Sequence, residues 1–194
     1  MKKNNKLNGK DLMNVGIFTA IYLVITIAIA MLGMIPIFMV LLCALVPLVG
    51  GIPVMLFYTK VKKPGMIFIM TVIMGLMMFI TGMGIYPFLV SIISGLLAEL
   101  IFKSGNYQSA FKGILAYAVS GLFIWGNYYE LFFHVEKYFS TRQDMGQEYI
   151  DTLTKLMPVW MCPVLFVVCL VCGIIGGYLG KAVMKKHFVK AGLV

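Results

Sequence analysis

Long apolar stretches dominate the chain, and short charged clusters separate them. The apolar stretches cover about residues 13–33, 34–59, 65–81, 85–102, 109–133 and 157–183. A helix of about 20 apolar residues is long enough to cross the roughly 30 Å hydrocarbon core of a bilayer. The pattern predicts an all-α, polytopic membrane protein with six transmembrane helices, folded as a single transmembrane domain over residues 1–194.

The second stretch leaves two possibilities open. It contains Pro47 and Pro53 with a Gly-Gly pair between them, which weaken helical hydrogen bonding. It can form one bent helix or two short ones. A single crossing keeps the lysine cluster at 60–63 on the same side as the other lysine clusters, so one bent helix is favoured.

Charge placement orients the predicted bundle. Only 12% of the residues are charged, about half the fraction of a soluble domain, and the net charge is +9. With six crossings, thirteen lysines fall on one side: Lys2, Lys3, Lys6, Lys10, Lys60, Lys62, Lys63, Lys103, Lys112, Lys181, Lys185, Lys186 and Lys190. The positive-inside rule makes that side, and both termini, cytoplasmic in a bacterial cell membrane. Lysines set between membrane spans indicate topology rather than a nucleic-acid partner.

A polar face is predicted near the outer end of the fifth stretch. Ser120, Asn127, Glu130 and His134 fall within an arc of roughly 80° on a continuous helix. Two interpretations stay open. The residues belong to an interfacial aromatic belt with a solvated glutamate, or they bind a ligand from the outside, since a pocket needs a few convergent polar groups.

The second interpretation makes a substrate-binding site of these residues, with aromatic walls. Its members are Ser120, Trp125, Asn127, Tyr128, Glu130 and His134. The outer loop 134–156 contains a stretch of helical character, and such a segment can lie over a site as a lid.

Two further features invite both a structural and a functional interpretation. Glu99 lies deep in the fourth stretch and precedes Lys103 at the i, i+4 spacing, which predicts a structural ion pair. In the first stretch, Gly16, Ala20 and Ala28 form a row of small residues that allows a close helix approach. That row either packs inside this chain or docks a separate subunit.

The last stretch carries its own small residues, Gly173, Gly176, Gly177 and Gly180, which predict internal packing. Catalytic motifs such as HExxH and GxSxG are missing from the sequence, so we do not expect an enzyme. Four cysteines in apolar stretches and 16 dispersed methionines indicate packing rather than a metal site or a bound cofactor.

The chain resembles the substrate-binding S component of energy-coupling factor (ECF) transporters, and within that group the Trep_Strep family of bacterial integral membrane proteins. The resemblance covers about residues 8–186 and rests on length, topology and the segments "LNGKDLMNVGIFTAIY" and "YPFLVSIISGLLAELIF". It implies capture of a small-molecule micronutrient at the outer face. It also implies association with a T component and two ATPase subunits, which hydrolyse the ATP.

The family docks through an Ala-x-x-x-Ala motif in its first helix, where this chain has Gly16 and Ala20. The resemblance leaves the substrate open between a vitamin and a haem-like tetrapyrrole, the latter motivated by Trp125, Tyr128, Tyr129 and His134. The alternatives of another class are a stand-alone secondary transporter or channel, a lipid-modifying enzyme and an assembly protein.

Overall fold

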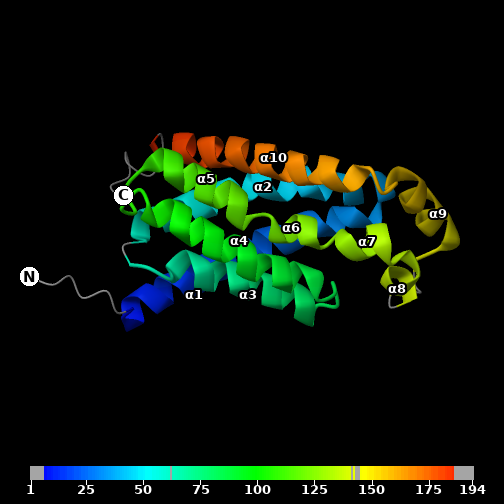
Figure 1. The fold of residues 1–194 in the computed structure, drawn as a ribbon, viewed down its shortest axis with the longest axis horizontal. Coiled ribbons are helices and arrows are strands. Elements are labelled where there is room, and N and C mark those ends of the chain that lie inside the picture. The colour runs from blue at the N-terminus through cyan, green and yellow to red at the C-terminus, as the bar shows by residue number, and fades with distance from the viewer. Residues whose placement is uncertain (1–6, 62, 141, 143–144, 186–194) are drawn as a thin grey trace, which may run out of the picture.

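Four long apolar helices run along the axis of an elongated helical bundle (Figure 1). They are α1 (Gly9–Ala30), α2 (Pro36–Lys60), α4 (Tyr86–Lys103) and α10 (Met161–Val183). The computed structural model describes residues 7–61, 63–140, 142 and 145–185. Within these residues, the four helices are long and apolar enough to cross a membrane, with α1 continued by the 3-10 helix η1 (Met31–Met34).

Shorter helices fill the rest of the bundle. The shorter apolar pieces are α3 (Met66–Ile80) and the run Ala110–Gly126, which includes α5 (Ala110–Ser120) and α6 (Phe123–Gly126). Four spans are therefore supported by length and composition, and the full count of six stays a prediction. The second apolar stretch is the single helix α2, which contains both prolines, rather than two short helices.

The helix expected over 109–133 is interrupted twice. It ends at Ser120, restarts as α6, and ends again before α7 (Tyr129–Phe133). At both breaks a backbone N–H bonds the carbonyl three residues earlier, as in a 3-10 helix, instead of the one four residues earlier. These bonds run from Leu122 N–H to the Val119 carbonyl and from Tyr128 N–H to the Trp125 carbonyl. The 80° arc calculated for a continuous helix therefore does not describe these side chains.

Glycines set the contact between α2 and α10. A Cβ atom on Gly51 would overlap the backbone of Gly176, and one on Gly180 would overlap the backbone of Gly51. Only glycine allows two helix backbones to approach this closely. Gly173 meets Ala118 of α5 in the same way. The prediction that the glycines of the last helix serve internal packing is confirmed.

The buried glutamate of α4 has a different partner from the predicted one. The Glu99 carboxylate accepts hydrogen bonds from the backbone N–H groups of Ile67 and Phe68, at 3.1 and 3.2 Å, and from the Tyr107 hydroxyl, at 2.8 Å. These N–H groups belong to the first turn of α3, whose free donors a carboxylate satisfies. In the part of the chain that the structure describes, Lys103 forms no ion pair, so the predicted Glu99–Lys103 pair is wrong.

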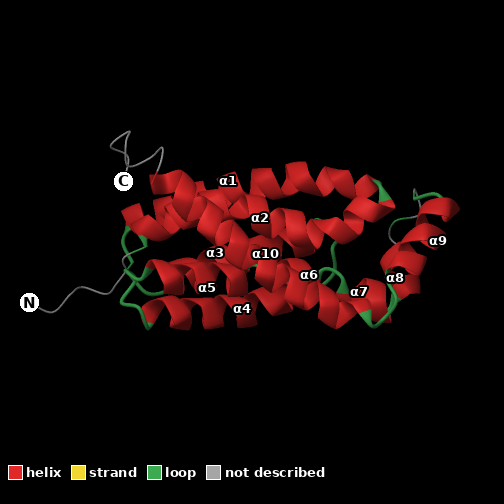
Figure 2. Cartoon of the chain, turned by 90° about the horizontal axis from the view of Figure 1, so that it is seen from above, coloured by secondary structure: helices red, strands yellow, loops and turns green. Residues whose placement is uncertain are grey.

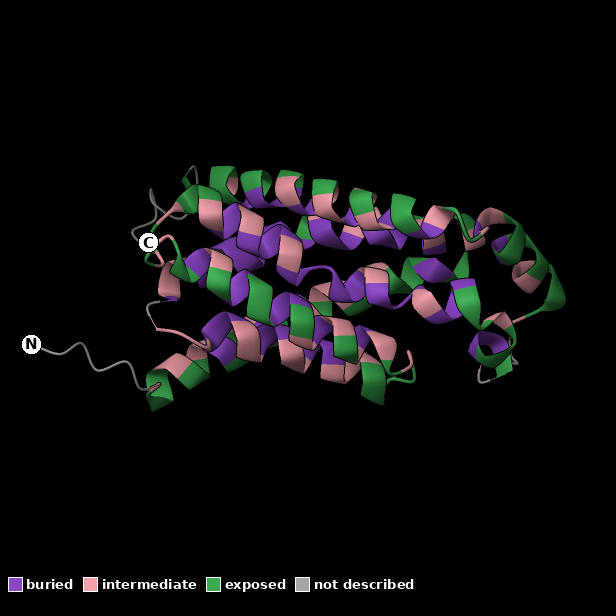
Figure 3. Cartoon of the chain, viewed as in Figure 1, coloured by how far each residue is buried: buried purple, intermediate pink, exposed green. Residues whose placement is uncertain are grey.

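The two ends of the bundle differ. The start of α1 and the end of α10 lie at one end, and the short helices α8 (Val135–Ser140) and α9 (Gln147–Leu156) lie at the other (Figures 1 and 2). We call these the basic end and the loop end. Buried residues face the bundle interior, and exposed apolar side chains such as Val24, Ile93 and Val167 face outward, where lipid would surround them (Figure 3).

Candidate functional site at the loop end

The turn between α6 and α7 is held by side-chain bonds to two neighbouring helices. The Tyr128 hydroxyl donates to the Met39 carbonyl of α2 at 2.7 Å, and its side chain is 1% exposed. The Trp125 indole N–H donates to the Cys162 carbonyl of α10 at 2.9 Å and packs edge-on against Phe166. Trp125 and Tyr128, which were predicted as aromatic walls of a ligand pocket, therefore anchor the broken helix to α10 and α2.

Glu130 lies at the centre of the loop-end contacts. It is 5% exposed, and its Oε1 atom lies 2.8 Å from Nζ of Lys137 in α8. This hydrogen bond to Glu130 raises the pKa of Lys137. On another side, a Cβ atom placed on Gly84 would lie 2.7 Å from the Glu130 Oε2 atom. The carboxylate is thus enclosed between α8 and the turn that joins α3 to α4.

Asn127 is the least satisfied polar group of the predicted set. The residue is 7% exposed, and its Oδ1 atom has no hydrogen-bond partner among the described residues. Buried polar side chains in proteins are paired in the large majority of cases, because an unpaired one costs about 1–3 kcal/mol. An orphaned amide oxygen beside a broken helix is a group that a ligand or a water molecule would satisfy.

His134 belongs to a cluster of rings at the surface. It is exposed, and its ring is nearly parallel to that of Tyr86, with centroids 6.3 Å apart. Tyr86 also contacts Tyr129 at a centroid distance of 4.2 Å. Tyr86, Tyr129 and His134 therefore offer adjoining aromatic faces at the loop end.

Ser120 lies apart from the rest. Its hydroxyl donates to the Tyr117 carbonyl and lies 3.5 Å from the Tyr58 hydroxyl. It lines a core cavity of about 10 Å³, together with Tyr22, Tyr58 and Thr71. That volume suits about one water molecule. The ligand site predicted for these six residues at the loop end stays a prediction, because Ser120 lines the small core cavity rather than a pocket at that end.

Several contacts, in addition to the Lys137–Glu130 ion pair, hold the 134–156 segment on the bundle or brace it internally. Arg142 donates to the Gly82 carbonyl at 2.9 Å and lies over the Tyr138 ring, 4.0 Å from its centroid. Burial raises the pKa of Tyr138 to about 12, although the nearby Arg142 charge lowers it. The Tyr149 hydroxyl of α9 donates to the Gly33 carbonyl at 2.5 Å. Leu153, on the same helix, is fully buried. The segment thus covers the end of the bundle as a lid would.

A shallow cavity of about 360 Å³ adjoins this lid. It is lined by Pro36, Glu148, Tyr149 and Thr152, from the start of α2 and the first turns of α9. The sequence did not indicate these residues as members of the site, nor Gly84, Tyr86, Lys137 and Arg142. The positive charges at 137 and 142 were a usable signal, because they lie in a segment of mixed charge next to a glutamate in an apolar stretch.

The predicted docking residues of α1 lie on its outer face. Gly16, Ala20 and Ala28 are all exposed, and a Cβ atom on Gly16 would meet no described atom within 4 Å. Packing within this chain, the first of the two open explanations, therefore does not account for this row of small residues.

The described residues form no cluster that would bind a metal ion. No group of three or more His, Cys, Asp or Glu side chains comes together in them. The four cysteines are free thiols, three of them buried and one half-buried. Two of the buried thiols donate to backbone carbonyls, Cys43 to that of Leu165 and Cys169 to that of Gly121.

A bundle of long apolar helices with a lipid-facing surface defines a polytopic helical membrane protein. The model of one family, described as a hypothetical bacterial integral membrane protein (Trep_Strep), matches residues 9–190, and the chain belongs to this family. The protein is therefore a bacterial integral membrane protein, and the lipid bilayer surrounds its helices. No curated protein and no solved structure matches the chain.

Proposed function

We propose that this protein is the substrate-binding S component of an ECF-type importer. In this proposal it captures a micronutrient at the loop end, on the outer side of the membrane. A T component and two ATPase subunits then power release of the substrate into the cell. ATP hydrolysis belongs to the partner chains, and this chain binds substrate without catalysing a reaction.

The outer face of α1 carries the proposal. The span that contains α1 is 17% buried within the bundle, compared with 50% for α2. Gly16 and Ala20 sit one turn apart on its exposed side. In hydrocarbon, where the hydrophobic effect does not drive helix association, small residues in a row favour close packing against another helix. A separate transmembrane subunit is the partner that this face fits.

The loop end supports the substrate-binding part. Discontinuous helices near a membrane-embedded site are typical of transporters, and α5–α7 form such a helix here. The orphaned Asn127 amide oxygen and the buried Glu130 carboxylate supply polar groups close to the breaks. α8 and α9 supply a cover, which opens once the Lys137–Glu130 and Tyr149–Gly33 contacts are released.

The substrate class is open between a vitamin and a tetrapyrrole. A flat ligand would stack on the rings of Tyr86, Tyr129 and His134 once the lid has moved. Haem bound through His134 would shift its Soret band on titration with the purified protein. An unchanged Soret band would exclude haem and leave a vitamin as the proposed substrate.

Affinity purification from the native host tests the proposal. We expect a T component and two ATPases to purify with the tagged protein, and we expect substrate uptake by proteoliposomes only when these partners and ATP are present. Uptake by the protein alone, driven by an ion gradient, would instead establish a secondary transporter.

A further inference from the structure

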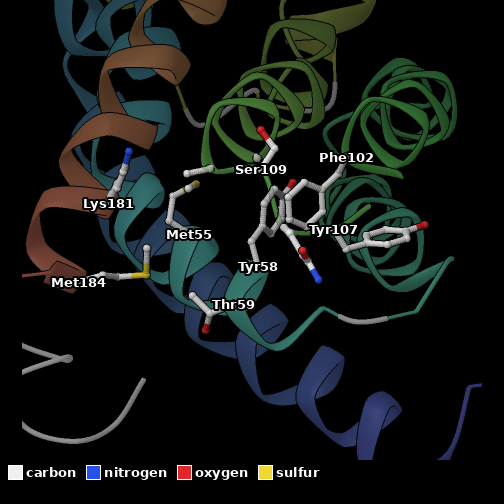
Figure 4. Close-up of a pocket in the computed structure, with 11 residues that line it drawn as sticks. Met55, Tyr58, Thr59, Phe102, Tyr107, Ser109, Lys181 and Met184 are labelled. Atoms are coloured by element: carbon white, nitrogen blue, oxygen red, sulfur yellow. The ribbon is translucent and has the colours of Figure 1, made fainter. Parts of the chain in front are cut away.

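A third cavity lies at the basic end of the bundle, and Figure 4 shows the residues that line it. It has a volume of about 300 Å³. The ends of α2 and α4, the turn before α5, the start of α5 and the end of α10 form its walls. Met55 and Tyr58 of α2 lie between Lys181 and Met184, at the end of α10, on one side and Phe102 of α4 on the other. Its size reaches the lower limit of ordinary ligand pockets.

Apolar side chains form most of the lining. The rings of Tyr58 and Phe102 are stacked with centroids 5.1 Å apart, and Met55 and Met184 add flexible hydrocarbon. Tyr58 is 4% exposed and lines both this cavity and the core cavity beside Ser120. Tyr58 is thus a wall residue shared by the two cavities. The core cavity holds only about 10 Å³, so a ligand would enter this cavity from the basic end.

Lys181 contributes a cation to this lining. It lies in the last turn of α10, and it makes no hydrogen bond or ion pair with any residue that the structure describes. The acid of this region, Glu99, lies behind Tyr107 and accepts three hydrogen bonds there, from the Tyr107 hydroxyl and two backbone N–H groups. Its carboxylate is therefore already satisfied by these three donors, and it forms no ion pair with Lys181 among the described residues. The start of α5 at Ala110 adds backbone N–H groups to the same wall.

We propose that this cavity binds the phosphate group of an anionic phospholipid. Lys181 pairs with the phosphate, and the Tyr58–Phe102 wall holds the glycerol and the first acyl carbons. A lipid fits better than a soluble phosphate because the walls are hydrocarbon and because the cavity lies at the helix ends. Lys60, Lys103 and Lys181 end the long helices here, as interfacial lysines do. Basic pockets between membrane helices suit anionic head groups. This site does not depend on the proposed transport function.

Binding of short-chain lipids to the full-length protein in neutral detergent tests this site. We expect dihexanoyl phosphatidylglycerol to bind saturably by calorimetry, and dihexanoyl phosphatidylcholine to bind at least about fivefold more weakly. Lys181→Gln should weaken phosphatidylglycerol binding about fivefold, since one lysine near a lipid head group contributes about 1 kcal/mol. Lys185→Gln removes the same charge one turn further along the chain, from a residue that does not line the cavity, and should change binding less than about twofold.

A second variant fills the cavity without touching the lysine. Ala110 is exposed at the rim, so Ala110→Phe keeps the bundle folded, which an unchanged melting curve verifies. It should abolish the preference for phosphatidylglycerol. Equal effects of Lys181→Gln and Lys185→Gln would overturn the site in favour of general surface attraction. Equally tight, Lys181-dependent binding of glycerol 3-phosphate would overturn the lipid assignment.

Discussion

The Nζ atom of Lys137 lies 2.8 Å from Oε1 of Glu130, and this ion pair joins α8 to the last piece of the broken helix. The two side chains differ in exposure, at 65% for Lys137 and 7% for Glu130. The exposed lysine thus covers one side of a buried carboxylate, and Gly84 lies close to its other side. Removing the lysine leaves a buried charge without its cation, which is more costly than losing an exposed pair.

Lys137→Gln should therefore loosen α8. We expect hydrogen exchange of residues 135–140 to speed up several-fold in lipid nanodiscs, while α10 keeps its protection. Lys155→Gln is the control, because Lys155 is exposed on α9 and forms no ion pair in the described residues. The same exchange rates in the two variants would show that the ion pair does not hold the lid.

The pH dependence of this ion pair has a definite sign. The pKa of Lys137 is raised above 10.5 by Glu130, so the pair contributes its stability below that pH and loses it only as pH rises through the raised pKa. The exchange difference between the wild type and Lys137→Gln should therefore stay constant from about pH 6 to about pH 9. A difference that disappears within this range would mean that another group controls the contact.

Two glycines in the turn between α3 and α4 provide a test of how closely Glu130 approaches Gly84. Both have left-handed backbone angles, with φ of 82° at Gly82 and 83° at Gly84. An alanine costs about 1–2 kcal/mol at either position. Only at Gly84 would the added Cβ atom also press on the Glu130 carboxylate, because a Cβ on Gly82 meets no described atom within 4 Å. Gly84→Ala should lower the melting temperature more than Gly82→Ala, and equal decreases would place Glu130 elsewhere.

The carboxylate of Glu99 should matter for stability, and the ammonium of Lys103 should not. Glu99→Gln weakens the charge-assisted bonds to the start of α3 and should cost about 2 kcal/mol, which lowers the melting temperature by about 4–8 °C. Lys103→Gln should change it by less than about 1 °C, since exposed charges contribute little. A double-mutant cycle between Glu99→Gln and Tyr107→Phe should reveal coupling. Coupling between Glu99→Gln and Lys103→Gln would instead support the Glu99–Lys103 ion pair.

The helices could be predicted from the sequence because their signal is local. An uninterrupted apolar stretch predicts a span wherever it occurs, and the ends of α2, α4 and α10 lie within a few residues of the predicted ones. The glycines of α10 were also readable, since small residues four apart indicate close packing in any membrane helix.

The breaks at 121–122 and 127–128 were not readable, because long-range contacts hold them. The Tyr128 hydroxyl bonds a carbonyl 89 positions away, and the Trp125 indole bonds one 37 positions away. The error at Glu99 has the same origin. The i, i+4 rule predicted Lys103 as the partner, whereas two of the three donors lie about 30 residues earlier in the chain and the third, Tyr107, lies eight residues later. No local pattern contains these partners, so the shape of the candidate site could not follow from helical periodicity.

The exposed face of α1 is the proposed docking surface for the partner subunits. Ala20→Leu adds a bulky side chain where nothing in this chain needs the space, so the melting temperature should stay within about 2 °C of the wild type. Recovery of the T component and the ATPases in affinity purification should fall at least about fivefold, because a leucine prevents the close helix approach that alanine allows. Ala182→Leu is the matched control, since it makes the same change at an exposed position on α10. Equal recovery with both variants would remove α1 as the docking helix, and loss of ligand binding with partner recovery intact would assign this face to the substrate.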